Sequence, residues 1–301
     1  METQHSALPA KGETIATIFV IVGSILYSTK SLFVKQMMFA SVDAGEILAL
    51  RLVWSAPIYL GVIAWVLLRH KAQWKDLAQM FVLGLWGFWL APRLNFAGLG
   101  HTSAGLERIL VQASTAFVIL FVAISLRKRP SKTVIASVVV CYLGLVIAMA
   151  GRDEGRAFAD LGGVGLILGG AVAWALFVVG VGRLQKRLGS GLCTSVGMAA
   201  AALPAMMEAI FVGDPGRVLH PQMSLVWPLV GLVLIGTVVP SFLSQAGLSR
   251  VGPERASVLS LVGPAVLPFL AAAVLQESMP IHQIAGLSVV LASCAVMSLR
   301  G

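Results

Sequence analysis

The chain has 301 residues, of which 58% are hydrophobic and 12% are charged, and its formal charge at pH 7 is +9. A charged share about half that of ordinary soluble domains excludes a water-soluble globular protein. The basic residues gather in short loops between apolar stretches, which argues against a nucleic-acid-binding face. Cys141, Cys193 and Cys294 form neither a CxxC pair nor an even-numbered framework, so neither disulfides nor zinc are expected.

Ten apolar stretches follow one another along the chain, each long enough to cross a bilayer core of about 30 Å as a helix. The expected spans lie near residues 14–39, 45–68, 77–99, 103–126, 133–150, 162–184, 192–212, 225–246, 255–275 and 281–299. The first stretch is longer than a signal peptide and has no convincing cleavage site, so we expect it to be retained. The predicted fold class is therefore an all-α membrane protein with ten transmembrane helices.

The Lys and Arg residues are divided unevenly between alternate loops. With the N-terminus inside, the inner segments hold fourteen of them, whereas the outer segments hold four, namely Lys35, Arg152, Arg156 and Arg217. Basic residues stay preferentially on the cytoplasmic side of a membrane. Both termini are therefore expected in the cytoplasm, and the loop around residue 152 is expected outside.

Five spans precede this outer loop and five follow it, so residues 1–150 and 151–301 would form two five-helix repeats of opposite orientation. Residues 26–35 resemble 174–183 at an offset of 148, and residues 115–144 resemble 264–293 at an offset of 149. Inverted repeats are typical of secondary transporters and place the substrate near the middle of the membrane. The alternative is that any ten-span chain divides into halves.

Two segments resemble a known family: HTSAGLERILVQASTAFVILFVAISLRKR, residues 101–129, and RASVLSLVGPAVLPFLAAAVLQES, residues 255–278. They resemble the fourth and ninth helices of EamA-type members of the drug/metabolite transporter superfamily. The family's proline and its acidic residue are present in the second segment as Pro264 and Glu277. In the first segment, Thr115 and Lys128 replace this proline and this acidic residue. The resemblance covers essentially the whole chain. It implies a ten-helix carrier of the bacterial inner membrane that exports amino acids or other small metabolites.

The ionisable candidates within the expected spans are Lys30, Arg51, Arg93, Glu107 and Arg108. Four cations facing lipid at mid-depth would cost about 10–14 kcal/mol, at about 2.5–3.5 kcal/mol each. Arg51 and Arg108 lie only about five or six residues from their helix ends, where long side chains can reach the headgroups. Lys30 lies about 13 Å from the end of its span at 1.5 Å per residue, too deep for that.

We therefore expect a wet, cation-lined cavity. In this hypothesis Lys30 or Arg93 binds a carboxylate or another anionic group of the substrate, and Glu107 pairs with an arginine or exchanges a proton. The alternative is that these groups are structural charges, which would affect folding and leave transport unchanged.

Helical spacing adds neighbours to these charges. Trp86, Trp89 and Arg93 would share one face of the third span, which would suit an amphipathic substrate, although lipid or helix packing explains tryptophans equally well. The second half offers mostly apolar residues at matching positions, so we expect an asymmetric site. The predicted substrate-binding residues are Tyr27, Lys30, Trp86, Trp89, Arg93, Glu107, Arg108, Gln112, Trp174 and Gln245.

Small residues at intervals of four predict faces for close helix packing in the sixth and seventh spans, at Gly165, Gly169, Ala173, Gly197, Ala201 and Ala205. Prolines within spans, including Pro92 and Pro240, remove helical hydrogen bonds that neighbouring groups must replace.

The chain has no GxxxxGK[ST] phosphate loop, which favours a secondary carrier over an ATPase. It also has no HExxH or GxSxG motif and no convergent acidic pair, so no enzyme, cofactor or metal is predicted. The expected partners are a small-molecule substrate, the lipid bilayer and a coupling proton, without nucleic acid. The alternatives are a multidrug or cationic-compound exporter and a non-transporting sensor or scaffold. Small multidrug exporters of this superfamily carry an acidic residue in the first helix, where this chain has Lys30.

Overall fold

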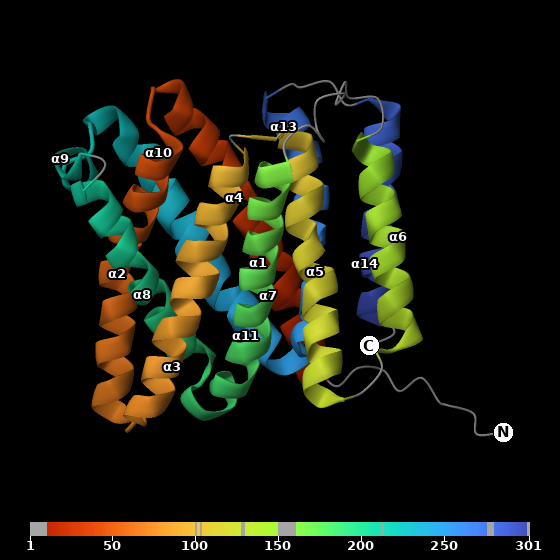
Figure 1. Ribbon diagram of the computed structural model, residues 1–301, viewed down its shortest axis with the longest axis horizontal. Coiled ribbons are helices and arrows are strands. Elements are labelled where there is room, and N and C mark those ends of the chain that lie inside the picture. The colour runs from red at the N-terminus through yellow and green to blue at the C-terminus, as the bar shows by residue number, and fades with distance from the viewer. Residues whose placement is uncertain are drawn as a thin grey trace.

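The structure is a computed structural model that describes residues 11–99, 101–102, 104–127, 130–149, 161–211, 214–275 and 280–299, and every regular element within these ranges is a helix. The helices of the first half are α1 (Lys11–Phe39), α2 (Ala44–Arg69), α3 (Trp74–Gly84), η1 (Leu85–Leu90), α4 (Ala91–Leu99), α5 (Ala104–Leu126) and α6 (Lys132–Met149). Figure 1 shows them interleaved with helices of the second half in one bundle.

The second half follows a similar order of elements. Its helices are α7 (Leu161–Leu188), α8 (Ser190–Phe211), α9 (Pro215–Leu219), η2 (Met223–Leu225), α10 (Val226–Val233), η3 (Leu234–Val238), α11 (Val239–Val251), α12 (Pro253–Leu259), α13 (Val262–Leu275) and α14 (Ile281–Leu299). Compared with the first half, α9 and η2 are added, and two helices, α12 and α13, stand in place of α5. The predicted boundary between the halves, at residues 150–151, lies outside the described residues.

Among the described residues, six helices are long and apolar enough to cross a membrane. They are Gly12–Phe39, Gly45–Arg69, Trp74–Gly98, Leu161–Leu188, Ser190–Phe211 and Met223–Val251. Three shorter apolar helices cover Leu110–Ser125, Lys132–Ala148 and Ile281–Val296. The predicted all-helical membrane character is thereby confirmed, whereas the number of crossings stays a prediction.

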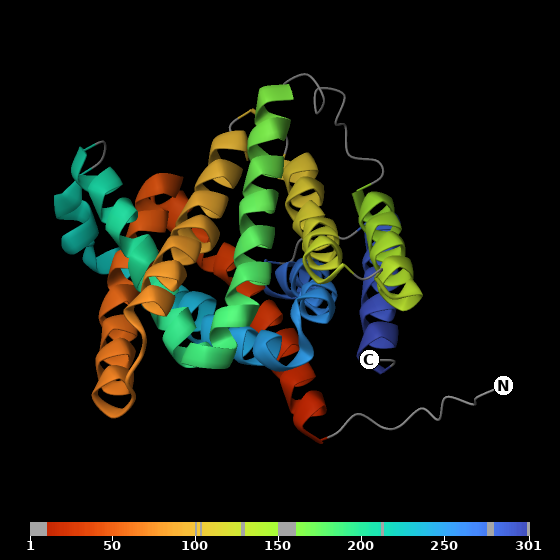
Figure 2. The same cartoon turned by 60° about the horizontal axis from the view of Figure 1, so that its bottom comes forward.

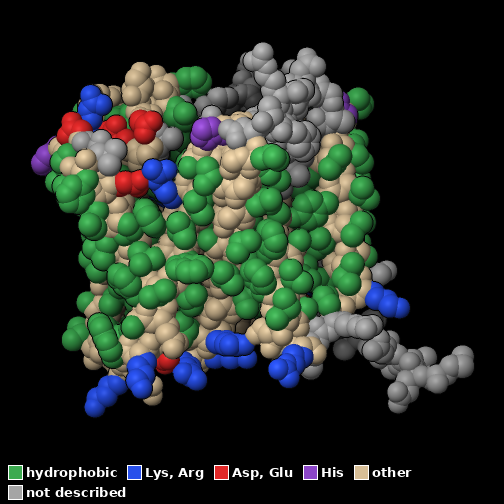
Figure 3. All heavy atoms as spheres, in the orientation of Figure 1, with side chains coloured by type: hydrophobic (Ala, Val, Ile, Leu, Met, Phe, Trp, Pro, Cys, Tyr) green, Lys and Arg blue, Asp and Glu red, His purple; other side chains and the backbone are tan. Residues whose placement is uncertain are grey.

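The face of the bundle that Figure 3 shows is divided into bands. Hydrophobic side chains cover its middle, and Lys and Arg line one end (Figure 3). We call this end the basic end; it carries Arg69, Lys71, Lys75, Lys186 and Arg187. Helix α1 begins there and α14 ends there (Figures 1 and 2). An apolar belt with polar ends is the arrangement that a bilayer requires of a helical bundle.

The two halves pack on each other in a reciprocal way. Helix α1 packs against α11 and α13, just as α7 packs against α4 and α5. Helices α2 and α8 pair with each other, and so do α6 and α14. In the α6–α14 pair, Ser293 Oγ donates a 3.0 Å hydrogen bond to the carbonyl of Ser137, and Gly144 and Gly286 meet at backbone distance. Such exchange of equivalent contacts is what two related halves produce.

A π-helix stands at the same place in each half. The segments η1 and η3 begin 149 positions apart. The same offset relates residues 115–144 to residues 264–293 in the sequence. Pro92 and Pro240 each follow two residues after the π-helix ends. A proline inside a helix removes one hydrogen bond and crowds the carbonyl of the preceding turn, and a wider π turn relieves that conflict. The Thr237 hydroxyl donates a 2.8 Å bond to the carbonyl of Leu232, which adds a partner inside this wider turn.

Glycines set the closest helix crossings. A Cβ at Gly84 of α3 would lie 2.3 Å from the Cα of Gly197 on α8, so these two backbones touch. The predicted packing face on α8 is thus confirmed at Gly197, and Ala201 and Ala205 are buried there. The prediction is wrong at Gly165 of α7, because a Cβ there would meet nothing within 4 Å. A Cβ at Gly169 would make an ordinary 3.6 Å contact, so this glycine does not mark a close crossing either.

Candidate functional site

Lys30 lies on α1 where this helix crosses the π-helix η3. A Cβ built at Gly236 of η3 would lie 3.0 Å from the Lys30 Cβ, so the glycine is what lets the lysine stem approach η3 this closely. The Lys30 Nζ lies 5.7 Å from the ring centroid of Tyr27, one turn earlier on the same helix. An aromatic face at this distance stabilises an ammonium group that has left bulk water. The structure thus brings together Tyr27 and Lys30, two of the predicted site residues.

Two charged side chains act on Lys30 from neighbouring helices: Arg51 of α2 and Glu107 of α5. Arg51 also lies within electrostatic range of Tyr27 and Tyr59. Its buried Nε has no hydrogen-bond partner among the described residues. A buried guanidinium donor without a partner is costly, and it is the type of group that a ligand oxygen satisfies.

Tyr59 extends the same polar region along α2. Its hydroxyl lies 2.8 Å from the Ser241 Oγ on α11. Because Ser241 donates its own proton to the carbonyl of Val238, Tyr59 is the donor in this pair. We call Tyr27, Lys30, Arg51, Tyr59 and Glu107 the Lys30 cluster. Its members come from α1, α2 and α5.

The sequence prediction covered part of this cluster. Tyr27, Lys30 and Glu107 were expected there, whereas Tyr59 was missed. For Arg51 the sequence left two alternatives open, a place in the cavity and a side chain that reaches the membrane surface. Tyr59 is fully buried, and a polar hydroxyl inside an apolar span was the signal that could have found it. Arg108 lies on α5 beside Glu107, but its side chain is outside the described part of the structure.

The reciprocal helix crossing, of α7 with η1, is lined by aromatic rings. Gly87 of η1 faces Phe177 of α7 in the same way that Gly236 of η3 faces Lys30 of α1. Phe177 packs against Phe88 at a centroid distance of 4.6 Å and against Trp174 at 5.3 Å. Trp174, a predicted site residue, therefore belongs to an aromatic cluster. The crossing of α1 with η3 thus carries a lysine, whereas the crossing of α7 with η1 carries only aromatic side chains among the described contacts, which is the kind of asymmetry that the sequence predicts.

The structure corrects one prediction, the common face of Trp86, Trp89 and Arg93. The prediction assumed α-helical spacing, but Leu85–Leu90 form the π-helix η1, in which the Ala91 N–H bonds to the carbonyl of Trp86. The rings consequently have different environments. Trp86 is 42% exposed, whereas Trp89 packs against the core, and its indole N–H is buried without a partner among the described residues.

Arg93 makes an ion pair with Glu208 of α8, with 2.5 Å between its Nε and the carboxylate Oε1. The prediction did not include Glu208, although it lies within the expected seventh span. The Arg93 side chain is 45% exposed and that of Glu208 is 32% exposed, so the pair lies where water or headgroups reach it. The described contacts of Arg93 thus lead to α8 and away from the Lys30 cluster. A role for Arg93 in binding the substrate stays a prediction.

The ion pair between Arg93 and Glu208 can be tested by substitution. Arg93→Gln and Glu208→Gln should each lower the free energy of unfolding by roughly 0.2–1 kcal/mol, because exposed ion pairs contribute little. Exchanging the charges, with Arg93→Glu and Glu208→Arg together, should restore most of that loss. Thermal unfolding of the purified proteins in detergent measures both effects. If Arg93→Gln abolished substrate binding while Glu208→Gln did not, Arg93 would act on the substrate instead.

Two remaining predicted residues have partners elsewhere. The Tyr142 hydroxyl donates to the backbone carbonyl of Gln112, which joins α6 to α5. The side-chain oxygen of Gln245 accepts a 2.7 Å hydrogen bond from Gln185 Nε2, which joins α11 to α7. Gln245 lies nine residues beyond Gly236, or about 13 Å along the helix towards the basic end. The Gln112 backbone and the Gln245 side chain therefore connect helices in this structure, and the binding role of both residues stays a prediction.

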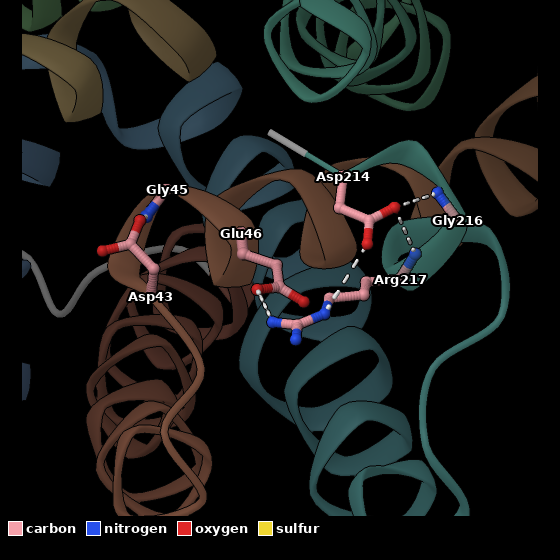
Figure 4. Close-up of polar contacts among 6 residues, drawn as sticks. All are labelled: Asp43, Gly45, Glu46, Asp214, Gly216 and Arg217. Atoms are coloured by element: carbon pink, nitrogen blue, oxygen red, sulfur yellow. Dashed lines mark hydrogen bonds and ion pairs between the residues drawn. The ribbon is translucent and has the colours of Figure 1, made fainter. Parts of the chain in front are cut away.

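Charged groups at the other end of the bundle fix the α8–α10 connection (Figure 4). Arg217 of α9 lies 3.9 Å from the carboxylate of Glu46 on α2 and 3.7 Å from that of Asp214. Asp214 also caps α9 by accepting bonds from the backbone N–H groups of Gly216 and Arg217, as Asp43 caps α2 through Gly45. These charged groups are therefore paired with one another, and they hold the loop before α9 against α2.

Comparisons with known proteins agree with this architecture. The model of the EamA-like transporter family matches residues 14–150 and 161–299. The uncharacterized transporter YcbK of Bacillus subtilis is 28% identical over 276 residues, covering 90% of this chain and 88% of that protein. An uncharacterized transporter of Archaeoglobus fulgidus is 25% identical over 230 residues, covering 75% and 79% respectively. One protein of known crystal structure superposes with a TM-score of 0.75 over 93% of this chain and 95% of its own, at 17% identity, which indicates a shared fold.

Proposed function

The chain belongs to the EamA-like transporter family, and on that premise we propose that it is a secondary carrier for small carboxylate-bearing metabolites, which it exports across the bacterial inner membrane. The substrate's anionic group would bind at the Lys30 cluster. Binding near mid-membrane between two related helical units is the usual arrangement in secondary transporters.

In this proposal the chain crosses the membrane ten times. Six long apolar helices and three shorter ones supply nine crossings, and α12 with α13 supplies the tenth. The basic end would face the cytoplasm, because Lys and Arg are retained on that side. Helix α1 begins and α14 ends at the basic end, so both termini would be cytoplasmic (Figures 1 and 2).

One observation carries the choice of substrate: Lys30 and Arg51 share a site between helices. Arg51 adds a second positive charge beside Lys30, and Glu107 adds one negative charge. Two cations and one carboxylate leave these three groups with net positive charge. Charge inside a membrane is costly unless it is paired or hydrated, so an anionic ligand is the partner that this site favours. A lipophilic cation would meet repulsion from both Lys30 and Arg51.

Transport in proteoliposomes tests the proposal directly. The purified protein would be assayed for uptake and efflux of acidic and neutral amino acids, simple organic acids and a lipophilic cation, with and without a pH gradient. Saturable movement of a carboxylate-bearing compound is the expected result, and acceleration by the gradient would identify a coupling proton. Movement of the cation alone would overturn the anion assignment and favour a multidrug exporter.

A further inference from the structure

A groove on the surface of the bundle lies between α3 and α7, with a volume of about 720 Å³. The two helices run antiparallel there, since Asp76 in the first turn of α3 meets Arg187 in the last turn of α7. Further from the basic end, Leu83 of α3 meets Gly180 of α7, where a Cβ would lie 2.9 Å from the leucine Cδ2. One end of the groove is therefore basic and the other is apolar.

Two arginines of α7 line the basic part of the groove. Arg183 donates to the Ser125 hydroxyl of α5, and Arg187 donates to the carboxylate of Asp76 over 3.2 Å. The Arg187 side chain is 70% exposed, whereas that of Asp76 is 7% exposed. A guanidinium has five N–H donors in a planar fork, so one hydroxyl or one carboxylate oxygen does not saturate it. The pair keeps both donor capacity and positive charge next to a membrane surface.

The apolar part is formed by side chains that do not compete for polar ligands. Val82, Leu83 and Gly180 line it, and Val82 is 52% exposed, whereas Ala78, Gln79 and Leu184 line the groove at the level of the arginines. Because Val82, Leu83 and Gly180 lie on the membrane side of the arginines, a bound molecule would need an anionic head near the aqueous surface and an apolar chain pointing into the bilayer. That description fits a phospholipid, and basic pockets between transmembrane helices at the cytoplasmic side commonly hold anionic headgroups.

We propose that the groove between α3 and α7 binds an anionic phospholipid of the cytoplasmic leaflet, with its phosphate between Arg183 and Arg187 and an acyl chain along Val82 and Leu83. This site is separate from the Lys30 cluster. It depends on the membrane orientation and not on the identity of the transported substrate. The bound lipid would join α3 of the first half to α7 of the second, two helices that also touch directly.

Native mass spectrometry of the full chain, titrated with dioleoylphosphatidylglycerol or dioleoylphosphatidylcholine, tests the proposal. The double variant Arg183→Gln, Arg187→Gln should raise the apparent dissociation constant for phosphatidylglycerol by about 30-fold, because each basic residue contributes about 1 kcal/mol towards an anionic lipid and 1.4 kcal/mol is tenfold. The matched control is Lys71→Gln, Lys186→Gln, which removes the same charge from the basic end outside the groove. It should bind the lipid like the unmodified protein.

Three outcomes would overturn the proposal. Equal losses in both double variants would indicate a general charge effect, and equal binding of phosphatidylcholine would remove the role of the anionic head. Displacement of the lipid by glycerol phosphate at equal concentration would indicate a free phosphate site without acyl-chain contacts. This competition uses the unmodified protein, so it decides the matter even if the arginine variant does not fold.

Discussion

Replacing Lys30 with methionine is expected to lower carboxylate transport at sub-saturating substrate by about 10- to 100-fold. A hydrogen bond to a charged group contributes about 1.5–3 kcal/mol, and 1.4 kcal/mol is a factor of ten. Methionine keeps a similar length and apolar volume, so the contact with Gly236 should survive. Initial rates of proteoliposome uptake would measure the effect. Arg51→Met should act in the same direction, because it removes the second positive charge beside Lys30.

The controls separate binding from folding. Lys30→Arg keeps the charge and should retain more activity than Lys30→Met, whereas Lys186→Met removes an exposed lysine at the basic end and should leave transport unchanged. If Lys30→Met were purified as a homogeneous protein and transported at the original rate, Lys30 would not bind substrate. If it were obtained only in low yield, thermal stabilisation by an added carboxylate would still compare its binding with that of the unmodified protein.

The sequence predicted the helices well because apolar length is a local property. The segments expected at 45–68 and 192–212 correspond closely to α2 and α8. The offset of 149 also anticipated the repeat, which the paired π-helices make visible in the structure. The π-helices themselves were not predicted, because Pro92 and Pro240 indicate a disturbed hydrogen bond without indicating whether the helix bends, breaks or widens.

The candidate site was predicted less completely, since contacts between helices are not local. Lys30 was found through its depth in an apolar span, which is a sequence property. Whether Arg51 faces the same cavity depends on how α1 and α2 are rotated against each other, and one sequence does not contain that rotation. Arg93 illustrates the same limit, because its partner Glu208 lies 115 positions away on α8.

Gly84→Ala is expected to be among the most destabilising single-methyl additions in the chain. Its new Cβ would lie 2.3 Å from the Cα and 2.6 Å from the carbonyl oxygen of Gly197, and backbone atoms cannot move aside without displacing α8. Overpacking of this kind costs typically 1–3 kcal/mol, and here it would also push away η1, which follows Gly84 directly. Thermal unfolding in detergent should show a clearly lowered Tm.

Two further glycines make the prediction a graded one. A Cβ at Gly197 would come within 2.9 Å of Met80 Cε and 3.0 Å of Phe88 Cε2, and these are side-chain atoms with some freedom to move. A Cβ at Gly61 would meet nothing within 4 Å, and alanine favours the helix there by up to about 1 kcal/mol. The expected order of Tm is therefore Gly61→Ala highest, Gly197→Ala intermediate and Gly84→Ala lowest. An unchanged Tm for Gly84→Ala would mean that α3 and α8 do not touch at this crossing, and the close packing of the two halves around η1 would have to be abandoned.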